Sequence, residues 1–308
     1  MAEEQRIGQH NVIEAETAGF EILAPPQWTA PLVFNSPHSG TEIPRHLLEA
    51  SKLSAIQLRA SEDVLVDELF LGCLDAGAPM LRALVSRSFV DLNREPYELD
   101  ARMFREKLPG HMNVSSPRVA SGLGTIPKTV GDGINIYPGP INLAEALRRL
   151  ERVYRPYHRT LNALLEEAHR AAGLVLLVDC HSMPSSAVQH HKTIRGSALD
   201  VVVGDRFGNA CQASFVELVE DHLAGAGLNV GRNKPYAGGF ITECHGHPRE
   251  GRHAVQIEIN RALYFDERQR TPTKGFAELK SILDKLALKL AGAVSSTAGH
   301  GPLAAAAE

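Results

Sequence analysis

The alternation of hydrophobic and polar positions divides the chain into short strands and amphipathic helices. Residues 174–178 form an unbroken apolar run between Gly173 and Pro184, which is typical of a strand buried on both faces. Residues 254–260 alternate instead, with Gln256, Glu258 and Asn260 on one face and three β-branched residues on the other. Further strands are predicted at 31–36, 79–85, 88–92, 197–203 and 228–231.

Helical periodicity is longest over residues 142–172, where apolar residues recur every three or four positions. Asn142 is a suitable N-cap, and Pro156 predicts a kink or a break. Residues 47–77 are predicted to be mostly helical, with a helix start at Ser61-Glu62-Asp63. Shorter helices are predicted at 210–224 and 274–292. Because strands and helices alternate along the chain, the pattern favours a layered α/β fold.

The same pattern predicts three parts of unequal size. Residues 1–30 are polar and irregular and should form an N-terminal arm or one edge strand, and residues 31–294 should form a single catalytic α/β domain. The alanine-rich end, 295–308, is expected to be a disordered tail. Inside the domain, residues 95–141 are rich in Gly, Pro and Asn, and a loop of this length is usually functional.

The composition is that of a globular protein with a sizeable core: 44% of 308 residues are hydrophobic, 22% are charged, and the net charge is −4. No Lys/Arg block indicates a nucleic-acid surface, and no stretch approaches the ~18 apolar residues of a membrane span. The N-terminus does not resemble a signal peptide, and the four cysteines form no CxxC pair. We therefore expect a cytoplasmic protein that acts on a small molecule and binds neither nucleic acid nor membrane. The oligomeric state stays open.

Polar residues that can carry chemistry follow or interrupt three predicted strands. His38 follows the strand at 31–36, His181 lies just beyond the apolar run, and Glu258 lies within the alternating strand. A lone loop histidine more often bonds a turn, and acidic residues such as Glu62 and Asp63 in a first helical turn more often complement the helix dipole. A carboxylate inside a strand, however, is costly unless it is paired or lies near a metal ion.

Metal-assisted amide hydrolysis needs two imidazoles and one carboxylate around zinc, with a fourth position left for water. It also needs a second carboxylate as general base and, for an amino-acid substrate, an arginine for the carboxylate. The chain supplies His38, His181, an acid from the pair at 62–63, Glu258 and Arg94. The alternative is Ser39 or Ser182 as a nucleophile with His181 as its base, but the chain has no Gly-x-Ser-x-Gly elbow.

Several other residues are predicted to bind substrate. Arg87 offers a second guanidinium seven residues before Arg94, and Gly238 and Gly239 permit close backbone approach to a ligand. The remaining candidates are polar side chains on or near the same loop or on the Arg94 motif: Asn93, Asn233, Thr242 and His245. Asp179 is expected to orient a neighbouring side chain.

Short motifs spread over residues 31–265 resemble the N-formylglutamate amidohydrolase (deformylase) family, which is similar in fold to zinc carboxypeptidases and aspartoacylases. The motifs are Ser36-Pro-His-Ser-Gly40, Asp63-Val-Leu-Val-Asp67, Asp91-Leu-Asn-Arg94, Ser121-Gly-Leu-Gly-Thr-Ile-Pro127, Arg155-Pro-Tyr-His158, Asp179-Cys-His-Ser182, Asn233 to Thr242, and Gln256-Ile-Glu-Ile-Asn260.

This resemblance implies a three-layer α/β/α fold with a mixed, mainly parallel central sheet, like that of zinc carboxypeptidases (phosphorylase/hydrolase-like). It implies one zinc ion held by His38, Asp63 and His181, where Asp63 matches the first aspartate of a helix-borne Asp-x-x-x-Asp. Glu258 matches the general base, and Arg94 with Asn93 falls where a substrate-gripping arginine is expected.

The implied activity is hydrolysis of N-formyl-L-glutamate to formate and L-glutamate in histidine catabolism. The chain departs from the family at Cys244-His245-Gly246, where His-Tyr-Gly is common, so His245 or His247 would act from a shifted position. Two alternatives stay open: a broader N-acyl-amino-acid deacylase or carboxypeptidase-like hydrolase, and a non-catalytic protein that binds acyl amino acids.

Overall fold

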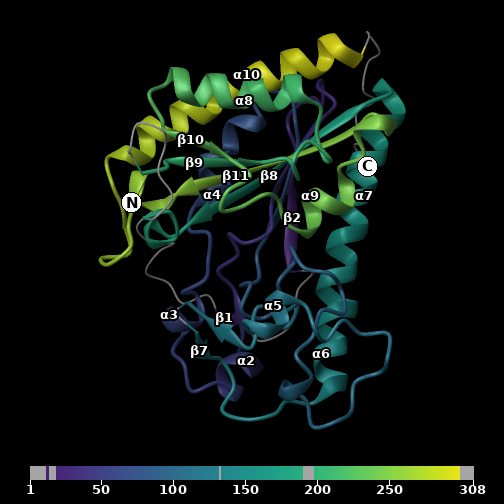
Figure 1. Cartoon of the computed structure of the whole chain (residues 1–308), viewed down its shortest axis with the longest axis vertical. Helices are drawn as coiled ribbons and strands as arrows, with labels where there is room; N and C mark the ends of the chain where they lie inside the picture. Colours follow the sequence, from purple (N-terminus) through teal and green to yellow (C-terminus); the bar gives the residue numbers. More distant parts are fainter. Residues whose placement is uncertain (1–11, 14–18, 132, 190–197, 299–308) are drawn as a thin grey trace.

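The computed structural model describes residues 12–13, 19–131, 133–189 and 198–298, and its centre is a seven-stranded sheet (Figure 1). The strands follow the order β10-β9-β11-β8-β3-β5-β2. Four neighbouring pairs are parallel, and the β9–β11 and β2–β5 pairs are antiparallel. The prediction of a mixed, mainly parallel sheet is confirmed. The strands are β2 (Phe20–Leu23), β3 (Leu32–Ser36), β5 (Met80–Ala83), β8 (Val175–Met183), β9 (Val201–Gly204), β10 (Val230–Arg232) and β11 (Arg252–Asn260).

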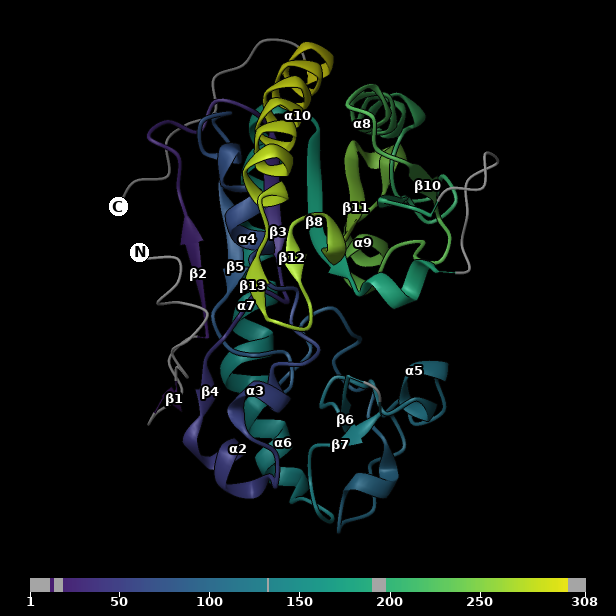
Figure 2. The same cartoon turned by 90° about the vertical axis from the view of Figure 1, so that its left-hand side faces the viewer.

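Helices cover both faces of the sheet, which gives three layers (Figure 2). One apolar core lies between the sheet and α4 (Val66–Leu69), α8 (Ala213–Gly225) and α10 (Gly275–Ala298). The other core lies between the sheet and α7 (Arg155–Ala172) with α9 (Phe240–His245). The second core continues into the end of the molecule that carries α2 (Arg45–Ala50), α3 (Ala55–Leu58), α5 (Pro117–Ala120) and α6 (Leu143–Arg149).

Short elements complete the described part of the chain. Three two-stranded sheets pair β1 (Val12–Ile13) with β4 (Ile43–Pro44), β6 (Thr129–Val130) with β7 (Ile134–Asn135), and β12 (Phe265–Asp266) with β13 (Thr271–Pro272). Single turns of 3₁₀-helix are η1 (Leu71–Cys73), η2 (Ala101–Met103), η4 (Ser185–Val188), η5 (Pro248–Glu250) and η6 (Arg261–Leu263).

Strand β8 is buried along its whole length, as the apolar run predicts. Because side chains alternate between the faces of a strand, Leu176, Val178 and Cys180 enter the core under α8 and α10. Asp179 and His181 point to the opposite face, at the carboxyl end of the strand. Cys180 is thus a packed thiol, and His181 is delivered to the edge where open α/β sheets place their sites.

The long predicted helix is interrupted before its proline. Asn142 caps α6, since its side chain accepts from the backbone N–H groups of Ala144 and Glu145. A π-helical turn, η3 (Leu150–Tyr154), then joins α6 to α7, where Pro156 lies in the first turn. Proline has no N–H to donate to the preceding turn, so a local change of helical pitch replaces the predicted kink.

The prediction that residues 47–77 are mostly helical is met only in part, because the segment consists of four short helical pieces, α2, α3, α4 and η1, joined by turns and loops. Asp63 precedes α4, and Leu65 adopts the left-handed conformation (φ 57°) at the start of that helix. The backbone N–H of Asp63 donates to the carbonyl of His38 rather than to a preceding helical turn. Asp63 is therefore held by a loop, not borne by a helix. The strand predicted at 88–92 is wrong, since residues 87–89 form a turn.

Both ends of the chain extend beyond the described residues. In the predicted N-terminal arm, residues 1–11 and 14–18 lie outside the description, while β2 pairs with β5 at the sheet edge. Helix α10 continues to Ala298, past the point where the tail was expected to begin, and residues 299–308 are not described. In the described ranges, no helix is both long enough and apolar enough to cross a membrane.

Candidate active site

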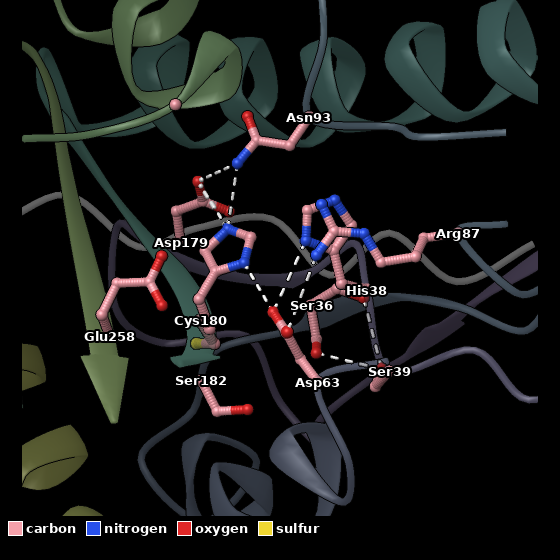
Figure 3. Close-up of polar contacts among 12 residues, drawn as sticks. Ser36, His38, Ser39, Asp63, Arg87, Asn93, Asp179, Cys180, Ser182 and Glu258 are labelled. Carbon is pink, nitrogen blue, oxygen red and sulfur yellow. Dashed lines mark hydrogen bonds and ion pairs between the residues drawn. The ribbon is translucent and has the colours of Figure 1, made fainter. Parts of the chain in front are cut away.

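Three buried side chains from distant parts of the chain meet beside the carboxyl ends of β3 and β8: His38, Asp63 and His181. Nδ1 of His181 lies 2.9 Å from Oδ2 of Asp63, and Nδ1 of His38 lies 3.5 Å from the same oxygen. Figure 3 shows His38 directed at this carboxylate. The candidate ligand atoms all lie within 4.8 Å of one another. This group is called the His-Asp-His cluster below.

The His-Asp-His cluster fits a divalent metal ion. Nδ1 of His38 is buried and has no hydrogen-bond partner among the described residues. An unsatisfied buried nitrogen is costly, and a metal ion would use its lone pair. Two imidazoles and one carboxylate are also the donor set of zinc sites that keep a position open for water or substrate.

The outer nitrogen of each histidine faces a carboxylate. Nε2 of His38 lies 2.8 Å from Oδ1 of Asp91, and Nε2 of His181 lies 3.2 Å from Oδ2 of Asp179. Such bonds fix ring orientation and increase the basicity of the nitrogen that remains. Both imidazoles are thus held with Nδ1 turned toward Asp63.

Charge compensation keeps the carboxylates of Asp63 and Asp91 ionised although both are buried. Burial alone would raise the pKa of Asp63, but the adjacent imidazoles of His181 and His38 hold it well below its usual range. Burial would likewise lower the pKa of His181, but Asp179 and Asp63 raise it well above its usual range. The pKa of Asp91 is also held low against the effect of burial, chiefly by Arg87. Asp63 is therefore a charged carboxylate that could bind a cation.

Both ring nitrogens of His181 are engaged by this arrangement, with Asp63 on one side and Asp179 on the other. Ser39 exchanges hydrogen bonds with Ser36, and the hydroxyl of Ser182 accepts from Arg261. The geometry favours a metal site over a serine nucleophile with His181 as its base.

Glu258 lies on β11 directly beside the cluster, because β11 and β8 pair in parallel with Glu258 opposite His181. Paired residues share a face of the sheet, so the two side chains point the same way. Burial raises the pKa of Glu258 to about 7, which suits a group that must take and return a proton. The side-chain amide of Gln256 donates to Oε1 of Glu258 and fixes its position.

Arg87 and Arg94 flank Asp91. Arg87 donates to Oδ2 of Asp91 at 2.7 Å, while one of its terminal nitrogens lies 3.8 Å from Oδ1 of Asp63. In Figure 3, Arg87 and Glu258 lie on opposite sides of Asp63. Arg94 lies 3.5 Å from Oδ2 of Asp91 and donates to the carbonyls of Leu123 and Asn93. The Arg94 side chain is 12% exposed, so the guanidinium remains at the edge of the buried site.

The side chains of Asn93 and Thr242 contact Asp179, and Gly239 lies against Asn93. The Asn93 amide nitrogen lies 3.0 Å from Nε2 of His181, and its oxygen accepts from the backbone N–H of Ile241. A Cβ on Gly239 would lie 2.4 Å from that amide nitrogen, so only glycine leaves room for Asn93 there. Thr242 is fully buried and lies 3.4 Å from Oδ2 of Asp179.

The other residues predicted to bind substrate have different surroundings. The side chain of Asn233 is bonded to Asp205 and braces the turn after β9. Gly238 has φ +116°, which only glycine adopts readily, and it packs against Thr242. His245 is buried at the end of α9, where burial lowers its pKa to about 4, and its Nε2 lacks a partner in the described part of the chain. His245 is therefore a neutral, partly unsatisfied group near Asp179.

Comparison with known proteins shows the family of the chain. The sequence model of N-formylglutamate amidohydrolases matches residues 30–265. The chain belongs to this family. It is accordingly a hydrolase that acts on an amide.

Individual proteins and solved structures are also similar to this chain. N-formylglutamate deformylases of Pseudomonas aeruginosa and Pseudomonas putida are 29% and 27% identical over 250 residues, which is 80% of this chain and 86% of each relative. The crystal structure of an N-formylglutamate amidohydrolase from Ralstonia eutropha superposes with a TM-score of 0.85 at 34% identity, over 91% of this chain and all of that one. A protein from Agrobacterium tumefaciens shares the fold, with a TM-score of 0.62 at 21% identity over 90% and 96% of the two chains.

Three residues of this family member were missed by the reasoning from sequence: Asp91, Gln256 and Arg261. Asp91 and Gln256 open two of the motifs quoted for the family, and both lie two positions before a residue singled out for chemistry. In a strand that spacing signals a shared face, as for Gln256 and Glu258. Asp91 and Asn93 do not lie in a strand, so the spacing carries no such signal for them. Arg261 follows the last strand motif directly, and nothing local distinguishes it from a surface arginine.

Proposed function

We propose that this protein hydrolyses N-formyl-L-glutamate to formate and L-glutamate, and that zinc is its cofactor. Membership of the amidohydrolase family supports the reaction class, and the two Pseudomonas deformylases support the substrate. The donor set of the His-Asp-His cluster supports the metal. The proposal includes a role in histidine catabolism, a cytoplasmic location, and residues 31–294 as one catalytic domain.

The observation that carries the proposal is the pairing of Glu258 with His181 across β11 and β8. It gives a buried carboxylate with a pKa raised to about 7 beside two imidazoles and a carboxylate that fit a metal ion. A hydrolytic site needs this combination, because one group must bind the electrophile's oxygen while another moves the proton of water.

In the proposed mechanism, zinc supplies polarisation of the formyl carbonyl and a lower pKa for a water molecule. Glu258 takes a proton from the attacking water as a carbon–oxygen bond forms. It then gives that proton to the departing nitrogen as the carbon–nitrogen bond breaks, which yields formate and the amino group of glutamate. Gln256 holds Glu258 in place for both transfers.

Substrate recognition is proposed for a further set of residues. Arg94 and Asn93 bind a substrate carboxylate. The remainder of the pocket is shaped by Arg87, Gly238, Gly239, Thr242, Asn233 and His245.

Replacing the general base tests the mechanism. Glu258→Gln keeps the size of the side chain but cannot accept a proton, so it should retain stoichiometric zinc and lose about 10²–10⁴-fold in kcat. Formate release and zinc content are the measurements. Glu62→Gln is the matched control, since Glu62 is a buried acid next to Asp63 that pairs with Arg59 instead. Near-normal turnover by Glu258→Gln would remove the residue from this role.

A substrate panel separates the proposal from its alternatives. N-formyl-L-glutamate should be hydrolysed much faster than N-acetyl-L-glutamate or N-formyl derivatives of uncharged amino acids. Similar rates across the panel would indicate a broader deacylase. A protein that contains no zinc and releases no formate, yet binds acyl amino acids, would indicate a binding protein.

Arg94→Ala tests recognition of the substrate carboxylate. KM should rise for substrates with a free carboxylate and change little for the corresponding amides, because only the former gain from a charged hydrogen bond. Arg102→Ala serves as the control, since Arg102 is an exposed arginine paired with Asp100. An equal loss with charged and uncharged substrates would contradict a carboxylate-binding role for Arg94.

A further inference from the structure

Arg261 is a buried arginine that joins two segments of the His-Asp-His cluster. It is the first residue of η6, directly after β11, and it is only 7% exposed. Its Nη2 donates to Oδ1 of Asp63 at 3.1 Å, and its Nε donates to the hydroxyl of Ser182 at 3.1 Å. Ser182 is the neighbour of His181. One guanidinium thus bridges the loop that carries Asp63 and the strand that carries His181.

The two oxygens of Asp63 have different partners. Oδ2 faces the Nδ1 atoms of both histidines, whereas Oδ1 accepts from Arg261 and lies 3.8 Å from Arg87. A carboxylate on a loop can rotate about its terminal bond, and this torsion is broad and roughly two-fold. A charged hydrogen bond to one oxygen would fix the rotation.

We propose that Arg261 is a positioning residue for the metal site: it holds Asp63 so that Oδ2 alone binds the metal ion. This inference rests on the metal site of the proposed function and adds a residue that sets its affinity. The fork of the guanidinium matters, because one arm binds Asp63 while another binds Ser182, and an ammonium group offers no such fixed geometry. Arg261 therefore also holds the Asp63 loop beside the end of β8.

Zinc affinity of purified protein tests the inference, measured by competition with a chromogenic chelator. Arg261→Met removes the charge and both arms and should raise the zinc Kd about 10- to 100-fold, the usual cost of losing a group that holds a ligand. Arg261→Lys and Ser182→Ala each remove part of the bridge and should give smaller rises. If Arg261→Met does not fold, the zinc Kd values of these two variants test the inference instead.

Arg82→Met is the matched control. Arg82 binds the carboxylate of Asp67, four residues after Asp63, and its side chain is also largely buried. This control should lower the unfolding temperature without changing the zinc Kd. An equal rise in Kd for Arg82→Met would mean that the effect is a general loosening of the fold, and the inference would fail.

The remaining outcomes are also decisive. Wild-type zinc affinity in the folded Arg261→Met protein, or in both partial variants, would overturn the inference. A higher KM for N-formylglutamate at saturating zinc, with an unchanged zinc Kd, would assign Arg261 to substrate binding instead. If wild-type protein binds no zinc at all, the metal site of the proposed function fails, a result distinct from each of these.

Discussion

Carboxylates behind the two histidines decide how the imidazoles are presented to a metal ion. Asp91 and Asp179 contact the outer nitrogens of His38 and His181, and each is held in turn by further hydrogen bonds. Asp91 receives the backbone N–H of Asn93, and Asp179 receives the side-chain amide of Asn35. Ring orientation in the site therefore depends on residues that do not face the metal position.

Asp91→Asn should weaken zinc binding about 10- to 100-fold, because an amide orients the His38 ring less strongly than a carboxylate does. Chelator competition gives the affinity. Asp205→Asn is the control, since Asp205 is equally buried but binds Asn233 and Arg232 near β10. The control should reduce stability while the zinc Kd stays the same. Unchanged affinity in Asp91→Asn would show that Asp91 does not tune the site.

At the scale of elements, helix α7 and the π-helical turn before it support the segment from Asp91 to Arg94. The hydroxyl of Tyr154 donates to the carbonyl of Arg94 at 2.5 Å, and Nε2 of His158 lies 2.9 Å from the carbonyl of Leu92. Tyr157, between them, donates to the side chain of Asn35. The change of helical pitch near Pro156 thus accompanies three contacts that reach the site, as is common for π-helical turns.

His158 should make stability depend on pH. Burial, reinforced by the nearby His245, lowers its pKa from 6.5 to about 4. In the unfolded chain His158 therefore becomes protonated below about pH 6.5, whereas in the folded chain it becomes protonated only below about pH 4. The free energy of unfolding consequently falls as the pH decreases through this window. At pH 5 the loss is on the order of 2 kcal/mol.

His158→Gln keeps a donor for the carbonyl of Leu92 but cannot titrate. Urea unfolding at pH 7.5 and pH 5 should show that wild type loses more stability than the variant between the two values. The difference in free energy of unfolding between the proteins should then narrow at pH 5. Parallel losses in both proteins would show that His158 does not contribute to the acid sensitivity.

Considered as a whole molecule, the site joins segments that are far apart in the chain. His38 follows β3, Asp63 precedes α4, and His181 belongs to β8, so all three ligands meet only in the folded state. A metal ion that binds this arrangement and not the unfolded chain should stabilise the fold. The expected gain is about 2.7 kcal/mol at a metal concentration of 100 times Kd.

Thermal unfolding with and without a chelator measures this linkage. Addition of zinc should raise the unfolding temperature of the chelator-treated wild type, and the increase should grow with zinc concentration. His38→Ala and His181→Ala should show no increase, because each lacks one of the three ligands. A zinc-dependent increase of wild-type size in either variant would contradict the ligand assignment.

The sequence by itself determined the elements with a strong local pattern. The apolar run of β8, the alternation of β11 and the periodicity of residues 142–172 each report burial that neighbouring residues share. Polar residues at or within predicted strands indicated His38, His181 and Glu258, and the family motifs selected Asp63 over Glu62. Residues 47–77 are less helical than predicted, and no helix begins at Asp63. Hydrophobic spacing does not reveal that Leu65 adopts a left-handed conformation or that the backbone N–H of Asp63 donates to the carbonyl of His38.

Only the tertiary structure decided which atoms face one another. The register of β11 on β8 places Glu258 beside His181, and long-range contacts assign Asp91 to His38 and Arg261 to the outer oxygen of Asp63. A periodic pattern states which face of an element is buried, but it carries no information on the partner across that face. Hydrogen bonds between distant segments depend on distances of a few tenths of an ångström, which the packing of the whole sheet sets.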